Sequence, residues 1–123
     1  MRGAKLIGTN PDVTGPSNDG IVPATGALMA PITLATGREP YYVGKPNPLI
    51  MRHALRRLGA RREETAIVGD RMDTDVLSGL EAGMDTTLVL SGVTSKRMID
   101  TFSYKPSYVL SGVGEIPPED FAC

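Results

Sequence analysis

The sequence predicts an α/β domain with an open parallel sheet, and two patterns indicate it. Short apolar runs rich in Val, Ile and Leu recur along the chain, with helix-length segments between them. The runs are continuous rather than alternating, which is typical of strands covered on both faces. A strand–helix–strand order favours parallel pairing with right-handed crossovers. The five predicted strands cover residues 5–8, 41–44, 65–69, 86–90 and 108–110.

Two segments between these strands carry a clear helical pattern. Residues 48–58 place apolar side chains at i, i+3, i+4 and i+7, the spacing of an amphipathic helix. Pro48 suits the first turn of this helix, and Gly59 suits its end. Residues 74–82 repeat the apolar pattern more briefly and stop at Gly83. Both segments are therefore predicted to be helices that connect neighbouring strands.

Three further segments have weaker signals. Residues 94–101 form a less regular helix candidate. Residues 25–36 open with Thr25 as a possible N-cap, but Pro31 inside the segment is expected to kink or delay the helix. Residues 10–24 are polar and rich in turn-forming residues, so they are predicted to be a long loop.

Composition excludes several classes of protein. The 123 residues carry a formal net charge of −1, whereas a nucleic-acid binder is usually strongly basic. No apolar run approaches the ~18 residues of a membrane span, and the first residues lack the apolar block of a signal peptide. The single cysteine, Cys123, cannot form an internal disulfide, which favours a reducing, cytoplasmic setting. The chain is expected to be an enzyme or part of one.

Charged residues follow two of the predicted strands where each strand ends. Lys45 comes directly after Gly44, and Asp70 comes directly after Gly69. In open parallel sheets, ligands bind beyond the carboxyl ends of the strands, and a glycine there lets the backbone approach a ligand closely. A lysine is a point charge for phosphate, and a carboxylate is a hard oxygen ligand for Mg²⁺. The pair predicts a phosphate and metal site at one edge of the sheet.

These charged residues also have simpler interpretations. A Gly-Lys-Pro turn is common in loops, so Lys45 alone would more often be a solvated side chain. Asp73 or Thr74 could cap the helix that follows Asp70. Asp75 is expected in the first turn of that helix, where a negative charge also suits the helix dipole. The pairing of Lys45 with Asp70 is the stronger signal.

Three stretches of the chain carry a resemblance to a known family. They are Gly44-Lys45-Pro46-Asn47-Pro48, Val68-Gly69-Asp70-Arg71-Met72-Asp73-Thr74-Asp75 and Leu88-Val89-Leu90-Ser91-Gly92-Val93-Thr94. These stretches resemble the haloacid dehalogenase (HAD) superfamily of phosphatases, with the greatest similarity to the branch that contains NagD-like proteins, nitrophenylphosphatases and pyridoxal-phosphate phosphatases. Residues 9–12 and 25–28 resemble the part of that branch where its large cap domain returns to the core.

The resemblance implies a fold and a reaction. Residues 40–123 would form the C-terminal half of a Rossmann-like, doubly wound parallel sheet, and residues 1–39 would be the tail of a C2-type cap domain. The reaction would be Mg²⁺-dependent hydrolysis of a phosphomonoester through an aspartyl-phosphate intermediate. The substrate would be a small phosphorylated metabolite.

The resemblance also implies a role for individual residues. Lys45 would hold the phosphoryl group and neutralise charge on the nucleophile. Asp70 would bind the metal directly, and Asp75 would orient that site without binding the metal itself. Asn10 and Asp12, in the part that resembles the cap, would contact the leaving group of the substrate.

The chain departs from the family pattern at the nucleophile. HAD phosphatases need an Asp-x-Asp-Gly segment directly after an apolar strand. The nearest match is Ser17-Asn18-Asp19-Gly20-Ile21, which has serine at the nucleophile position and no preceding apolar strand, so it is predicted to be a turn. The 123 residues are therefore expected to need an N-terminal half as partner and to be inactive alone. Without that half, residues 65–69 would be an open apolar sheet edge that invites dimerisation.

Two other functions stay open at this point. The chain could be a truncated remnant that no longer catalyses and acts only by binding or association. It could also be a receiver-type switch domain, but such a domain needs an acidic pair near its first strand, and residues 1–10 contain no acidic residue.

Overall fold

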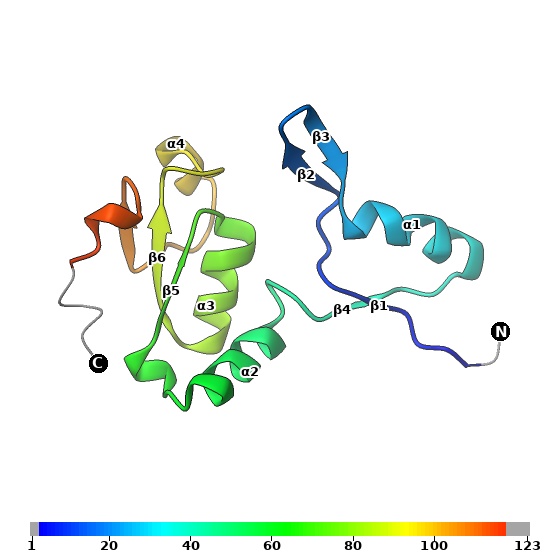
Figure 1. Cartoon of the computed structure of the whole chain (residues 1–123), viewed down its shortest axis with the longest axis horizontal. Coiled ribbons are helices and arrows are strands. Elements are labelled where there is room, and N and C mark those ends of the chain that lie inside the picture. Colours follow the sequence, from blue (N-terminus) through cyan, green and yellow to red (C-terminus); the bar gives the residue numbers. More distant parts are fainter. Residues whose placement is uncertain (1–2, 118–123) are drawn as a thin grey trace. The chain divides into compact units, whose positions relative to one another are not determined.

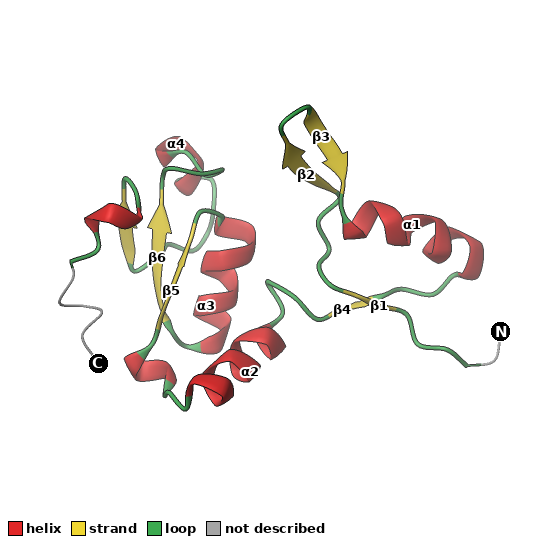
Figure 2. Cartoon of the chain, viewed as in Figure 1, coloured by secondary structure: helices red, strands yellow, loops and turns green. Residues whose placement is uncertain are grey.

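The computed structural model describes residues 3–117 and contains alternating helices and strands (Figures 1 and 2). The chain divides into two compact units, Met1–Ile50 and Met51–Cys123. Cys123, on which the expectation of a reducing setting depends, lies outside the described residues. Among residues 3–117, no helix has both the length and the apolar character needed to cross a membrane.

The second unit contains a three-stranded parallel sheet. Its strands are β5 (Ala66–Gly69), β6 (Asp85–Val89) and β7 (Tyr108–Leu110), in the order β5-β6-β7. The pairing is parallel at both steps, which confirms the predicted α/β class. All three strands lie within one residue of their predicted bounds, because each is a short run of apolar and β-branched residues that turn-forming residues interrupt.

The connection from β5 to β6 begins with a wide helical turn. Met72–Val76 forms one turn of π-helix, and α3 (Leu77–Ala82) continues from it. Gly83 ends α3 in the left-handed region, with φ of 69°, as the sequence predicted. The connection from β6 to β7 contains α4 (Lys96–Ile99), which is shorter than the predicted helix over 94–101.

The core of this unit lies on one face of the sheet. Gly79 in α3 brings the helix against Ile67 and Thr86, and a Cβ at Gly79 would lie 2.5 Å from the Thr86 methyl carbon. Leu88, at the centre of β6, is fully buried. The apolar side chains that form the core cluster are Met72, Val76, Leu88 and Ile99, with Leu90, Phe102 and Tyr104 packed against them.

The opposite face of the same sheet is open in the described part of the chain. Val68 on β5 is 41% exposed and Tyr108 on β7 is 57% exposed. The expectation that all strands are covered on both faces is therefore wrong for β5 and β7, and it holds only for most of β6. The reason is position: β6 is central, whereas β5 and β7 are the edges of this sheet. The open edge predicted at residues 65–69 is confirmed for this sheet.

The first unit contains two small two-stranded sheets. In one, β1 (Ile7–Gly8) pairs in parallel with β4 (Tyr41–Tyr42). In the other, β2 (Thr14–Ser17) pairs antiparallel with β3 (Gly20–Pro23).

The β2–β3 hairpin corrects the prediction that residues 10–24 are a loop. Its strands lack alternating apolar residues, and this is why the sequence pattern did not indicate them. The signal was in the turn, where two residues connect Ser17 to Gly20 and Gly20 has φ of 121°. The predicted turn at Ser17–Ile21 is confirmed for Asn18 and Asp19, whereas Ser17, Gly20 and Ile21 lie in the two strands.

Helix α1 (Thr25–Thr36) differs from prediction at two residues. Its N-cap is Ala24, and the Thr25 hydroxyl instead shares a 2.8 Å hydrogen bond with the Thr9 hydroxyl. The proposed Thr25 cap is therefore wrong. The helix also starts before Pro31 and continues through it, although the proline ring removes one N–H from the helical hydrogen bonds.

Helix α2 (Pro48–Leu58) has the predicted bounds. Asn47 caps it: the backbone N–H of Leu49 donates to Asn47 Oδ1 at 3.0 Å. Pro48 then occupies the first helical position, where its missing N–H costs nothing. Gly59 follows the helix with φ of 65°.

Candidate functional site

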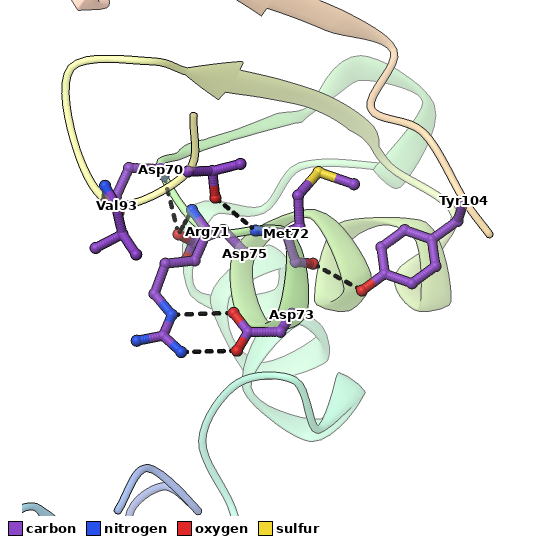
Figure 3. Close-up of polar contacts among 8 residues, drawn as sticks. Asp70, Arg71, Met72, Asp73, Asp75, Val93 and Tyr104 are labelled. Carbon is purple, nitrogen blue, oxygen red and sulfur yellow. Dashed lines mark hydrogen bonds and ion pairs between the residues drawn. The ribbon is translucent and has the colours of Figure 1, made fainter. Parts of the chain in front are cut away.

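Asp70 lies at the carboxyl end of β5, where the chain turns into the π-helical turn (Figure 3). The N–H of Val93 donates to Asp70 Oδ2 at 2.8 Å, and the N–H of Thr94 donates to the Asp70 carbonyl at 3.0 Å. Val93 and Thr94 belong to the loop that follows β6. The ends of two neighbouring parallel strands therefore meet at this carboxylate, as the strand-end argument predicted.

Asp75 fixes the start of the same turn. The backbone N–H groups of Asp70 and Arg71 both donate to Asp75 Oδ2 at 3.1 Å. The side chain is buried against the Cα of Gly69, where a Cβ would overlap the Asp75 carboxylate. Asp75 therefore lies in the turn as predicted, and it acts on the backbone that carries Asp70.

Two side chains hold the π-helical turn from further along the chain. The N–H of Met72 donates to Thr94 Oγ1 at 3.3 Å. The Tyr104 hydroxyl donates to the Met72 carbonyl at 3.1 Å, as Figure 3 shows. Burial raises the pKa of Tyr104, and the negative charge of Asp73 raises it further. Both contacts restrict the turn between Asp70 and Asp75.

Asp73 pairs with Arg71 and does not cap the helix. Arg71 Nε donates to Asp73 Oδ1 at 3.0 Å, and the second guanidinium nitrogen donates to Oδ2 at 2.7 Å. Hydrogen bonding to Arg71 lowers the pKa of the Asp73 carboxyl, against an opposing effect of burial. The π turn has no side-chain cap, so the cap predicted at Asp73 or Thr74 is wrong. The Arg71 guanidinium also neutralises one carboxylate beside the predicted metal ligand.

The predicted phosphate and substrate residues all belong to the first unit. Gly44, directly before Lys45, lies so close to Thr9 that a Cβ there would overlap the Thr9 carbonyl. The same Cβ would lie 3.7 Å from the Asn10 Cβ, so Asn10 is next to the turn that carries Lys45. Asn10 Oδ1 is buried and makes no hydrogen bond within the described residues.

Asp12 is held by its backbone near the start of α1. The N–H of Gly26 donates to the Asp12 carbonyl at 2.8 Å, and a Cβ at Gly26 would lie 2.9 Å from the same oxygen. Position 26 therefore requires glycine, because the backbone of residues 11–12 lies too close for a side chain. Residues 9–12 thus contact the Gly44 turn, which resembles the core, and the first turn of α1, which resembles the cap return.

The sequence and structural comparisons identify the family. Residues 42–116, well over half of the chain, match the family described as HAD-hydrolase-like. The chain belongs to this family. The HAD-hydrolase-like assignment confirms the resemblance drawn from the strand-end motifs around Lys45 and Asp70.

Named relatives of this HAD-hydrolase-like chain are phosphatases. It is 55% identical over 116 residues to the dihydroxyacetone phosphatase of Corynebacterium glutamicum, covering 94% of this chain and 42% of the relative. It is 51% identical to the ribonucleotide monophosphatase NagD of Escherichia coli K12, covering 93% of this chain and 44% of that protein. The chain therefore spans less than half the length of these curated relatives.

Solved structures give the same relationship. The structure of NagD from Escherichia coli K-12 superposes with a TM-score of 0.86 at 50% identity, covering 94% of this chain and 45% of that one. The 4-nitrophenylphosphatase of Thermotoga maritima superposes with a TM-score of 0.86 at 39% identity, covering 98% and 46%. The α/β architecture is thus that of the NagD-like branch.

HAD phosphatases generally use a divalent metal, and Asp70 fits such an ion as one ligand. Its Oδ2 accepts the Val93 N–H, and its Oδ1 accepts no hydrogen bond from the described residues. Within residues 3–117, no group of three or more His, Cys, Asp or Glu side chains is placed to hold a metal. Mg²⁺ commonly takes one or two carboxylates and completes its shell with water and phosphate oxygens. Asp70 therefore fits as a partial site.

The structure brings some of the predicted residues together. Asp70 and Asp75 are joined through the backbone of the β5 turn, and Asn10 lies next to the turn of Lys45. Lys45 belongs to the first unit and Asp70 to the second, so their sharing of one cleft stays a prediction.

Sequence reasoning missed two contributors to the site, the loop at Gly92–Thr94 and Tyr104. The loop at Gly92–Thr94 follows a predicted strand, so the rule that identified Asp70 could have found it as well. Tyr104 had no such signal, because its role depends on a contact with a residue 32 positions away.

Proposed function

We propose that this chain is the metal- and phosphate-binding part of a phosphatase that hydrolyses small phosphorylated metabolites. The observation that carries the proposal is the fixed Asp70 carboxylate at the end of β5, in a chain 51–55% identical to named phosphatases. Mg²⁺ is the proposed metal, since a lone hard carboxylate with room for water and phosphate ligands suits it. When bound, the ion would stabilise negative charge on the phosphoryl oxygens.

The proposed roles follow the chemistry of each side chain. Asp70 binds the metal through Oδ1, while the Val93 N–H holds Oδ2. Asp75 keeps the Asp70 backbone in place and does not itself bind the ion. Lys45 binds a phosphoryl oxygen, and Asn10 and Asp12 contact the remainder of the substrate.

The nucleophile and the general acid are proposed to come from outside these 123 residues. Relatives are more than twice as long as the matched region, which leaves room for such a segment. The Ser17–Ile21 stretch cannot replace it, because it forms the turn of an exposed hairpin. The proposed partner is therefore an N-terminal half of the same type of enzyme. We also propose that the protein works in a reducing, cytoplasmic setting.

The open face and edge of the second-unit sheet support a partner of this kind. Val68 and Tyr108 expose apolar surface there, and β5 is an edge strand of this sheet in the described part of the chain. At ~25 cal/mol per Å², leaving a few hundred Å² uncovered forgoes several kcal/mol of stabilisation. We expect the lone chain to dimerise or aggregate. A monomer in sedimentation, together with cooperative thermal melting well above about 50 °C, would contradict this expectation.

Complementation tests the catalytic proposal. The chain is assayed for 4-nitrophenyl phosphate hydrolysis with Mg²⁺, alone and after mixing with the part of the Corynebacterium glutamicum relative that it does not match, which we propose to be the N-terminal half. The chain alone should be inactive, and the mixture should be active. Asp70→Ala should abolish this activity, whereas the control Gly114→Ala should not, because a Cβ there meets no atom within 4 Å.

Two outcomes would contradict the proposal. Strong Mg²⁺-dependent activity of the chain alone, lost on Asp70→Ala, would show that the nucleophile lies within these residues. Activity of the mixture that persists in Asp70→Ala would remove Asp70 from the metal site. A non-catalytic association module would instead show tight binding to the N-terminal part with no hydrolysis.

A further inference from the structure

We propose that Gly92 is a positioning residue that decides which oxygen of Asp70 is available to a metal. The inference rests on the proposed function, because it concerns the same carboxylate. Gly92 lies in the loop after β6, directly before Val93, whose N–H donates to Asp70 Oδ2. It is the absence of a side chain at position 92 that allows this loop to close on Asp70.

The space at Gly92 is already filled by Asp70. A Cβ built on Gly92 would lie 2.5 Å from the Asp70 Cβ and 2.6 Å from its Cγ, and it would overlap Oδ2. Real Cβ atoms essentially never come closer than 3.0 Å to such neighbours. The φ of Gly92 is not positive, unlike that of Gly83 and Gly59. Glycine is therefore required at 92 for space and not for backbone conformation.

Asp70 has little freedom to move away from an added side chain. Its backbone N–H donates to the buried Asp75 carboxylate, and its carbonyl accepts the Thr94 N–H. An alanine at 92 would therefore push on the Asp70 carboxylate or on the loop itself. Either movement separates the Val93 N–H from Oδ2, so both carboxylate oxygens change their surroundings.

Gly112 provides a matched control in the same unit. A Cβ there would meet only Ser91 Cβ and Oγ, both at 3.8 Å, which is ordinary contact. Its φ of −169° is extended backbone that any residue adopts. Gly112→Ala thus adds the same methyl group beside the same loop without reaching Asp70.

The experiment compares Gly92→Ala and Gly112→Ala in the 123-residue chain. The first measurement is the hydrogen-exchange protection factor of the Val93 amide, followed in ¹H–¹⁵N spectra and corrected for the residue type at position 92. The second is binding of Mn²⁺ as a probe metal, followed by broadening of amide signals near Asp70. Gly92→Ala should lower the protection of the Val93 amide and weaken Mn²⁺ binding about 10-fold or more, the size of effect seen when a ligand loses its orienting partner. Gly112→Ala should change neither measurement.

A double variant assigns the effect to Asp70. In the Asp70→Gly background the overlapping atoms are gone, so adding Gly92→Ala should leave the Val93 protection factor at the value that Asp70→Gly alone gives. Unchanged Val93 protection and unchanged Mn²⁺ affinity in the single variant Gly92→Ala would overturn the proposal. If Gly92→Ala fails to fold, recovery of the fold in the Asp70→Gly background supports the proposal, and failure there overturns it.

The outcome is separable from that of the proposed function. If the unaltered chain binds no Mn²⁺, the metal proposal fails. The protection of the Val93 amide in the single and double variants would still decide whether Gly92 positions Asp70.

Discussion

The two compact units differ in what holds them together. All the buried apolar side chains of the described residues belong to the second unit. In the first unit, large apolar side chains such as Ile21 and Leu34 are 78% and 86% exposed. The first unit is held mainly by backbone hydrogen bonds, such as those from Tyr41 to Leu6 and from Val43 to Gly8, at 2.9 and 3.0 Å.

This difference divides the candidate site. Asp70 and Asp75 are attached to a packed core through the π-helical turn, so their geometry is set within the second unit. Lys45 and Asn10 depend on a unit without buried apolar side chains among its described residues. Regions with few buried apolar contacts open at low free-energy cost. The proposed metal ligand is therefore expected to be organised in the lone chain, whereas the residues proposed to bind phosphate and substrate are expected to need a partner for stability.

The largest expected effect tests where stability resides. Leu88→Ala removes a fully buried side chain from the second-unit core, so unfolding should become easier by about 2–5 kcal/mol. Leu34→Ala, in α1, removes a side chain that is 86% exposed and should change stability by no more than about 0.5 kcal/mol. Urea denaturation of both variants measures the difference.

A large loss on Leu34→Ala would break the comparison. It would show that α1 buries its apolar face in solution, against a second copy or another segment. Repeating the measurement at several protein concentrations separates these cases, because only a second copy makes the loss concentration-dependent.

The second prediction concerns Asp75, whose carboxylate accepts two backbone N–H groups. Asp75→Ala leaves the N–H groups of Asp70 and Arg71 without this acceptor, at a cost of about 1–3 kcal/mol. Asp75→Asn keeps an oxygen acceptor and should lose less. The two variants are compared by thermal unfolding, with hydrogen exchange of the Asp70 amide as a local measure. Equal losses would mean that charge, and not the acceptor, is what the turn requires.

The sequence predicted the second unit better than the first for a physical reason. Strand β6 buries Leu88 and Val89, and β5 and β7 are short runs of apolar residues that flank it. Such runs leave a pattern in the sequence. Strands β2 and β3 are almost wholly exposed, so no apolar pattern marked them and the hairpin was predicted to be a loop. Only the turn after Ser17 carried a local signal.

The site shows the same limit at the level of single residues. Asp70 was predictable because strand ends in parallel sheets collect functional side chains. The pairing of Asp73 with Arg71, and the loss of the predicted cap, depend on the π-helical turn, which no spacing rule indicated. Tyr104 and Gly92 act through contacts between distant segments, which only the folded chain defines.

The smallest predicted effect concerns Tyr104. Tyr104→Phe removes the hydroxyl that donates to the Met72 carbonyl at 3.1 Å, and it should cost about 1 kcal/mol at neutral pH. The ring and its packing beside Phe102 are kept, so the core should be unchanged. The loss is measured by urea denaturation.

The pH dependence sharpens this prediction. Burial raises the pKa of Tyr104 in the folded chain, so the folded state holds this proton more tightly than the unfolded state does. The resulting stabilisation is complete below the unfolded pKa of about 10 and is lost as the pH rises through the folded pKa. The difference in stability between the unaltered chain and Tyr104→Phe should therefore shrink above about pH 10. A difference that stays constant from neutral to alkaline pH would show that the Tyr104 hydroxyl does not hold the turn between Asp70 and Asp75.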